Sequence, residues 1–97
     1  MITGEGRLER RSRSAVRLRI SSLDRPSLVE LAMTENVSHS GARILVKDGW
    51  KPGERVSVEP AGTMDSCLAC VVYCEPLKTG STAVGLRLEK PRPDWAR

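Results

Sequence analysis

Six short apolar segments separated by turn signals constrain the fold of this chain more than any other feature. They occupy residues 16–20, 27–38, 41–46, 55–60, 67–74 and 82–88. Most of them alternate apolar and polar side chains, which is typical of a strand with one buried face. Glycine, proline, asparagine and aspartate are common in the intervals, as expected for turns. Strands of this regularity usually close into a small barrel or a sandwich, because exposed strand edges are then removed or protected.

The segment 27–38, SLVELAMTENVS, fits two kinds of secondary structure, and its surroundings favour one of them. Leucine, glutamate, alanine and methionine all favour a helix by intrinsic preference. The side chains also alternate, and the strand-like GARILV of residues 41–46 follows after a short polar turn. We therefore predict a strand here and an all-β chain. The segment 67–74, CLACVVYC, is apolar on both faces and is predicted to be a central strand.

The chain of 97 residues is long enough for one domain and buries only a modest core. Its aromatic residues are Trp50, Tyr73 and Trp95, so we expect Val, Leu, Ile, Ala and Cys side chains to form the core. An odd number of cysteines and the lack of an apolar N-terminal segment argue against secretion. No apolar run approaches the ~18 residues needed to span a membrane, so we expect a cytoplasmic protein.

Positive charge is concentrated at the front of the chain, where LERRSRSAVRLRI crowds arginines ahead of the first strand. Residues 1–25 hold seven arginines and three acidic residues, which accounts for the whole net charge of +4. Arginine outnumbers lysine twelve to four, and a guanidinium can hold a phosphate or carboxylate through two hydrogen bonds. The pattern indicates an anionic partner, and a solvated basic tail is the alternative.

A second polar motif, ENVSHSGAR at residues 35–43, places Asn36, Ser38 and Gly41 in an N-x-S-x-x-G spacing. Asn and Ser side chains satisfy backbone groups in tight turns, and glycine permits positive φ. The same side chains can instead contact the polar edge of a ligand. The motif alone leaves both an ordinary turn and a binding site open.

The cysteines and the single histidine do not form a convincing metal or catalytic site. Residues three apart on a strand face opposite sides, so Cys67 and Cys70 cannot share an ion. Cys70 and Cys74 are expected on one face, but two thiols without a nearby histidine are not a site. We expect small buried apolar residues and no metal. Because His39 falls in the predicted turn and no phosphate loop is found, the sequence also argues against an enzyme.

The arginine-rich lead-in, the later N-x-S-x-x-G motif and the ARILV that follows resemble the PilZ domain. In that family an R-x-x-x-R stretch precedes the first barrel strand, and a D/N-x-S-x-x-G stretch lies at the second and third strands. The segments KPGERVSV and ACVVYCEPLKTGSTAVGLRLEKP are also similar to the family. The resemblance implies a small six-stranded antiparallel β-barrel of split-barrel type. It divides the single domain 1–97 into a flexible basic arm (1–14), the barrel (15–90) and a tail (91–97).

PilZ domains bind cyclic di-GMP, a bacterial second messenger with two phosphates and two guanines. The resemblance implies a receptor or adaptor domain that relays this binding to a protein partner or a second copy, with no further cofactor. Arginines can grip the phosphates, hydrogen-bond guanine O6 and N7, or stack on the purine, while Asn and Ser bind the other guanine's edges. The implied ligand-binding residues are Arg10, Arg11, Arg13, Asn36, Ser38 and Gly41, with Arg7, Arg17 and Arg43 as additional candidates.

The arginine spacing leaves other functions open. Two R-x-x-x-R pairs occur, Arg7 with Arg11 and Arg13 with Arg17, whereas Arg10 and Arg13 are three apart. Because some PilZ domains lack the motif, a PilZ-like protein-interaction module that does not bind cyclic di-GMP is the alternative function. A small barrel that binds nucleic acid through its basic arm is a third hypothesis. Such surfaces usually carry stacking aromatics and this chain has few, so we expect no specific nucleic-acid partner and no membrane.

Overall fold

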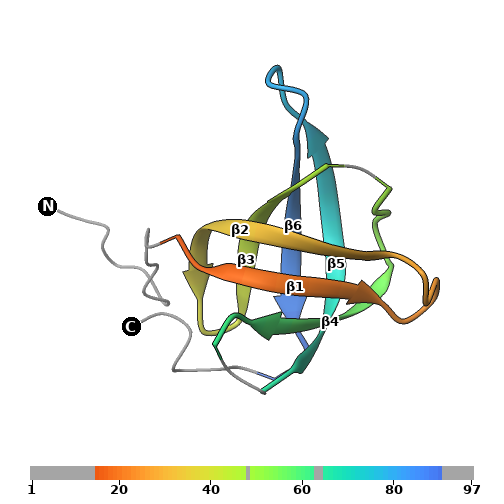
Figure 1. Cartoon of the computed structure of the whole chain (residues 1–97), viewed down its shortest axis with the longest axis vertical. Helices are drawn as coiled ribbons and strands as arrows, with labels where there is room; N and C mark the ends of the chain where they lie inside the picture. Colours follow the sequence, from red (N-terminus) through yellow and green to blue (C-terminus); the bar gives the residue numbers. More distant parts are fainter. Residues whose placement is uncertain (1–14, 48, 63–64, 91–97) are drawn as a thin grey trace, which may run out of the picture.

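The computed structural model describes residues 15–47, 49–62 and 65–90 of the chain. In this part the chain forms six strands: β1 (Arg17–Ser22), β2 (Val29–Ser38), β3 (Gly41–Val46), β4 (Arg55–Pro60), β5 (Cys67–Pro76) and β6 (Thr82–Leu88). They close into an antiparallel barrel in the order β1-β2-β3-β6-β5-β4 (Figure 1). The predicted six-stranded antiparallel barrel is confirmed, including the strand within residues 27–38. A helix with the length and apolar character needed to cross a membrane is not found in the described residues.

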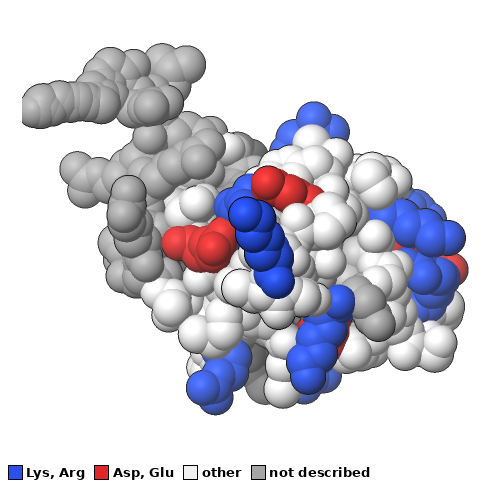
Figure 2. All heavy atoms as spheres, turned by 90° about the horizontal axis from the view of Figure 1, so that it is seen from above, with Lys and Arg blue, Asp and Glu red and all other residues white. Residues whose placement is uncertain are grey.

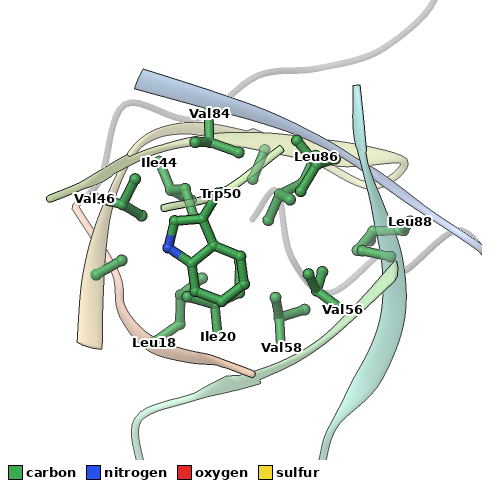
Figure 3. Close-up of a cluster of buried hydrophobic side chains, with 14 of the residues drawn as sticks. Leu18, Ile20, Ile44, Val46, Trp50, Val56, Val58, Val84, Leu86 and Leu88 are labelled. Carbon is green, nitrogen blue, oxygen red and sulfur yellow. The ribbon is translucent and has the colours of Figure 1, made fainter. Parts of the chain in front are cut away.

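Inward-facing aliphatic side chains fill the barrel, as the alternation predicted. β1 directs Leu18 and Ile20 inward and β4 directs Val56 and Val58 inward, all at most 1% exposed. The expectation that only Val, Leu, Ile, Ala and Cys form the core is wrong, because Trp50 lies at its centre. The loop between β3 and β4 carries the indole into the barrel, among apolar side chains of β1, β3, β4 and β6 (Figure 3). A turn-rich sequence around this residue concealed its role as a core residue.

A buried carboxylate ties the loop after β1 to the loop before β4. Glu54 is only 6% exposed and accepts hydrogen bonds from the Ser22 hydroxyl at 2.5 Å and the Arg25 guanidinium at 2.7 and 2.8 Å. The backbone N–H of Lys51 donates a further bond of 3.1 Å. These donors, Arg25 first, lower the pKa of Glu54 to about 2, although burial alone would raise it. We call these four residues the Glu54 anchor.

Two β-bulges change which side chains face outward. The register shifts between Thr34 and Asn36 in β2, and between Val71 and Tyr73 in β5. Each bulge places one extra residue in its strand, so residues beyond it face the side opposite to that expected from simple alternation. The bulge in β2 positions the candidate site, and the bulge in β5 alters the arrangement of the cysteines.

The strand predicted at residues 67–74 forms as part of β5 and pairs with β4 on one side and β6 on the other. Its outer face is not buried, because Leu68, Val72 and Tyr73 are exposed. Cys70 and Cys74 do not share a face, because the bulge lies between them: Cys74 packs against the core, whereas Cys70, between the core residues of β5, faces outward. All three cysteines are half-buried rather than fully buried.

Candidate functional site

The bulge in β2 decides which way the N-x-S-x-x-G motif faces. Thr34, before the bulge, is buried at 4% exposure. Beyond the bulge Val37 packs into the core, so its neighbours Asn36 and Ser38 point away from the core; Asn36 is half-buried, and Ser38, at the end of the strand, is 7% exposed. With simple alternation, Asn36 and Ser38 would share the inward face of Thr34. The bulge therefore turns Asn36 and Ser38 away from the core and toward a hollow in the barrel surface.

Ser38 ends β2 and closes the turn to β3 with weak contacts. Only His39 and Ser40 lie between the two strands, because Ser38 already pairs with Gly41. The Ser38 hydroxyl accepts a bond of 3.4 Å from the Ser40 backbone N–H and lies 3.5 Å from the Gly41 carbonyl. Hydrogen bonds of this length are weak, so the hydroxyl keeps capacity for a stronger partner. The Ser38 hydroxyl can therefore close the turn and still hydrogen-bond a ligand in the hollow.

Gly41 is needed for close approach of two strands and not for an unusual backbone conformation. Its φ is not positive, because positive φ in the described residues occurs at four other glycines. The interpretation that Gly41 supplies positive φ is therefore wrong. A Cβ at Gly41 would lie 2.3 Å from the backbone carbonyl oxygen of Leu86 on β6. Only glycine allows β3 to begin this close to β6.

A hollow of about 230 Å³ adjoins the motif on the outer surface of the barrel. Its walls include Asn36, Ser38 and Gly41 of the motif, together with Tyr73 and Arg87 from β5 and β6. Pockets that enclose a whole small-molecule ligand usually measure ~300–1,000 Å³. The described residues therefore form a partial pocket, large enough for a portion of a dinucleotide.

Tyr73 and Gly85 form a flat part of this hollow. They lie opposite each other in β5 and β6, and a Cβ at Gly85 would come within 2.1 Å of the tyrosine ring. The ring therefore covers the glycine, and Tyr73 is still 39% exposed. A partly exposed aromatic ring can pack against a planar group of a ligand.

Arg43 is held beside this ring by two carboxylates. Its Nε donates to Glu35 at 2.6 Å, and its Nη1 lies 3.1 Å from Glu75 and 3.0 Å from the Tyr73 hydroxyl. The guanidinium carbon lies 5.8 Å from the centre of the Tyr73 ring, within the range of a cation–π contact. These partners, Glu35 first, raise the pKa of Arg43 above its ordinary value. We call these four residues the Arg43 cluster.

Arg87 is the other arginine of the hollow, and it has a different environment. It lies opposite Gly41 across β3 and β6, and it is exposed. Within the described residues Arg87 forms no ion pair, in contrast to Arg43. Its charge is therefore available to an anion that enters beside the motif.

The predicted arginines at the front of the chain are Arg7, Arg10, Arg11 and Arg13, and they lie outside the described residues. The point where their segment joins the barrel is described. The Val16 N–H donates to the Thr34 hydroxyl at 2.8 Å, and the Thr34 N–H donates to the Val16 carbonyl at 2.9 Å. Because Asn36 lies just beyond Thr34 on β2, the arginine-rich segment joins the barrel beside the motif (Figure 1).

Arg17, an additional candidate, does not line this hollow. It lies opposite Met33 across β1 and β2, and lines a separate hollow on the outer surface with Leu31 and Met33. The structure therefore brings together Asn36, Ser38, Gly41 and Arg43 and separates Arg17 from them.

Comparison with known families decides what this barrel is. The model of the PilZ domain matches residues 6–95, almost the whole chain. The chain belongs to the PilZ family. The resemblance seen in the arginine-rich lead-in and the N-x-S-x-x-G motif is thereby confirmed, and PilZ domains are binding and adaptor domains.

The PilZ barrel is also similar to a solved structure, the Bacillus subtilis inhibitor of motility MotI/DgrA. The TM-score is 0.69 at 14% sequence identity, over 93% of this chain and 45% of that one. At this identity the likeness shows a shared fold, and this chain spans less than half the length of MotI/DgrA. No curated protein matches the chain by sequence.

Four residues in or beside this PilZ site were not predicted from the sequence, namely Tyr73, Arg87, Glu35 and Glu75. They are distant from the motif in sequence or, for Glu35, inside an undetected bulge. Only the register of the strands brings Tyr73 and Arg87 to the hollow, and Glu35 and Glu75 to Arg43. One signal was available, because an isolated glycine inside a strand, here Gly85, often marks a close approach.

The charges of the PilZ barrel do not form one continuous basic surface on the face seen in Figure 2. Lys and Arg side chains stand there in separate groups, with Asp or Glu beside several of them and uncharged residues between. Proteins that bind nucleic-acid backbones usually carry a clustered basic patch or stripe. This face of the described residues therefore offers little support for the nucleic-acid hypothesis.

Proposed function

We propose that this PilZ domain is a cyclic di-GMP receptor that relays binding of the dinucleotide to a protein partner. The observation that carries the proposal is the reciprocal pairing of Val16 with Thr34, which joins the arginine-rich segment to the barrel beside Asn36. Three extended residues span up to about 10 Å. Arg13, three residues before Val16, is therefore within about this distance of the point where the chain pairs with Thr34 on β2.

Each part of the proposed site suits one part of the ligand. The two phosphates of cyclic di-GMP attract Arg10, Arg11 and Arg13, and the exposed Arg87 adds a further guanidinium beside Gly41. The side chains of Asn36 and Ser38 offer donors and acceptors to a guanine edge, and the exposed part of the Tyr73 ring offers an apolar contact to the base. The hollow takes part of the ligand, and the arginine-rich segment supplies the remaining contacts.

Binding of this kind makes and breaks no covalent bond, so the proposal includes no catalysis. A second messenger acts inside the cell, so the proposal also includes a cytoplasmic location. Burial of Trp50 weighs against the nucleic-acid hypothesis, because it removes one of the few aromatic side chains that could stack on bases.

Isothermal titration of the full chain with cyclic di-GMP tests the proposal. We expect binding, and we expect combined replacement of Arg10, Arg11 and Arg13 by alanine to weaken it by more than about tenfold, since charge-assisted hydrogen bonds are lost. Ser38→Ala is expected to weaken binding less. Ser57→Ala on β4, away from the hollow, is the matched control and should leave the affinity unchanged.

Absence of any heat at high micromolar dinucleotide would remove the receptor function. Intact affinity in both the arginine and the Ser38 variants would show that the dinucleotide binds elsewhere. A protein-interaction module that does not bind cyclic di-GMP is the second candidate. The observation that favours it is the exposed apolar side of β2, with Leu31 at 69% exposure.

A further inference from the structure

The outer side of β2 carries three exposed apolar residues in a row. Val29, Leu31 and Met33 are 51%, 69% and 40% exposed, and all three face away from the core. We call them the β2 strip. Single exposed apolar residues are ordinary on protein surfaces, but a contiguous apolar surface marks an interaction site more often. A hollow of about 350 Å³ adjoins the strip, and Leu45 of β3 lines it.

Basic side chains border the strip on both sides. Arg19 lies opposite Leu31 and Arg17 opposite Met33 across β1 and β2. Lys47, just after β3, lines the same hollow. Neither Arg17 nor Arg19 forms an ion pair within the described residues.

The two acidic residues near the strip do not cancel the positive charge of its border. Glu30 accepts hydrogen bonds from the Lys47 backbone N–H at 2.5 Å and the Trp50 indole at 3.0 Å, so its carboxylate is used internally. Glu59 lies opposite Arg19 on the side away from the strip. The strip is therefore an apolar surface with a positively charged border.

We propose that the β2 strip is the docking surface for an acidic segment of another protein that carries apolar side chains. Such a segment places its apolar residues on Leu31 and Met33 and its carboxylates near Arg17 and Arg19, which is the complementary arrangement of charge. The role of this protein as the relay partner rests on the proposed receptor function, whereas the surface chemistry does not.

Two other occupants fit the charges less well. A second copy facing the strip through a two-fold axis would bring the same arginines and lysine together from both sides, and like charges in contact disfavour such a pairing. The chain's own residues 1–14 carry four arginines and two glutamates, so they are repelled by the same border. An acidic partner removes both difficulties.

The strip also shares a strand with the proposed ligand site. Met33 lies before the bulge on β2, and Asn36 and Ser38 lie after it. Arg17, which borders the strip, lies four residues after Arg13 in the chain. Dinucleotide bound at the hollow therefore lies next to the partner surface.

Selection of displayed random peptides on the immobilised full chain tests the docking proposal. We expect the recovered peptides to combine Asp or Glu with Leu, Ile or Phe. Fluorescence polarisation of these peptides should show about tenfold weaker binding to the Leu31→Ser variant, since the change removes the most exposed apolar side chain of the strip. Leu68→Ser, an exposed leucine on β5, is the matched control and should bind as the unmodified chain does.

Charge reversal supplies the second arm of the test. Arg19→Glu should weaken binding of the selected peptides, while Lys78→Glu, in the exposed loop before β6, should not. Recovery of basic peptides, or equal losses in the Leu31 and Leu68 variants, would overturn the proposal. A dimer of the unmodified chain that the Leu31→Ser change dissociates, measured by sedimentation equilibrium, would assign the strip to a second copy and also overturn it.

The docking proposal and the receptor proposal fail separately. A chain that binds the selected peptides but gives no heat with cyclic di-GMP retains the docking surface and loses the receptor function. A chain that binds cyclic di-GMP but selects no acidic peptides retains the receptor function and loses the docking surface.

Discussion

Arg25 and Arg43 both contact carboxylates, but the partners of the two arginines differ strongly in exposure. The Glu54 side chain beside Arg25 is 4% exposed, whereas the Glu35 and Glu75 side chains beside Arg43 are 39% and 57% exposed. The same ion-pair chemistry therefore serves two purposes. Loss of a partner in the Glu54 anchor leaves the buried Glu54 carboxylate or the buried Ser22 hydroxyl without its hydrogen bond. Ion pairs in the Arg43 cluster can be exchanged with water or with an incoming anion at little cost.

The largest expected effect comes from Glu54→Gln, which removes the buried charge and keeps the shape. Ser22, Arg25 and the Lys51 backbone N–H then lose their charged acceptor. We expect the free energy of unfolding to fall by about 1–3 kcal/mol, measured by urea denaturation. Glu75→Gln in the Arg43 cluster is the matched control, with a change within about 0.5 kcal/mol. Equal losses in the two variants would contradict the distinction between the clusters.

The next largest effect is expected in how the free energy of unfolding changes at acid pH, where Glu54 should contribute through its lowered pKa. The pKa of Glu54 is lowered to about 2 in the folded chain, chiefly by Arg25, and an unfolded glutamate titrates near ~4.3. Because the folded pKa is depressed, this stabilisation is fully present above the unfolded value and is lost as the pH falls towards 2. Between neutral pH and pH 3, the free energy of unfolding, measured by urea denaturation, should fall more steeply for the unmodified chain than for Glu54→Gln. Parallel slopes would show that Glu54 does not titrate in this way.

A smaller effect is expected on ligand binding from the Arg43 cluster. Glu75→Gln removes a negative charge from beside Arg43, which lines the hollow, and frees one side of its guanidinium. We expect cyclic di-GMP to bind about twofold to fivefold more tightly, in line with the strength of an exposed ion pair. Isothermal titration measures this, with Glu59→Gln on β4 as the control of equal charge change. Weaker binding in Glu75→Gln would show instead that Glu75 holds Arg43 in its binding position.

The smallest expected effect is the response of each ion pair to salt. A double-mutant cycle between Arg43 and Glu75 should give a coupling of about 0.2–1 kcal/mol at low salt and almost none near ~1 M NaCl, where screening is strong. The cycle between Arg25 and Glu54 should change less, because the buried carboxylate is shielded from ions. A salt response of equal size in both cycles would remove the distinction between them.

Much of the fold was predictable because its signals are local. Alternation at Leu18 and Ile20, and again at Val56 and Val58, identifies strands that bury one face. The turn residues between the strands identify a chain of short antiparallel connections. The N-x-S-x-x-G motif is also local, so its residues could be named before their surroundings were known.

The parts that could not be predicted depend on contacts between distant residues. Trp50 sits in a turn-rich segment, and only the space inside the closed barrel explains its burial. The bulge in β2, which turns Asn36 outward, has no clear local signal, because it arises from the register with β3. Tyr73 and Arg87 join the hollow through pairing of β5 and β6.

The sequence by itself determined six strands, their inward faces, and the polar motif with its basic lead-in, because each depends on residues close together in the chain. Tertiary structure alone decided the outward direction of Asn36 and Ser38, the burial of Trp50, and the contrast between the Glu54 anchor and the Arg43 cluster. The physical reason is that burial and charge environment are properties of the closed barrel. They exist only after strands far apart in sequence have paired.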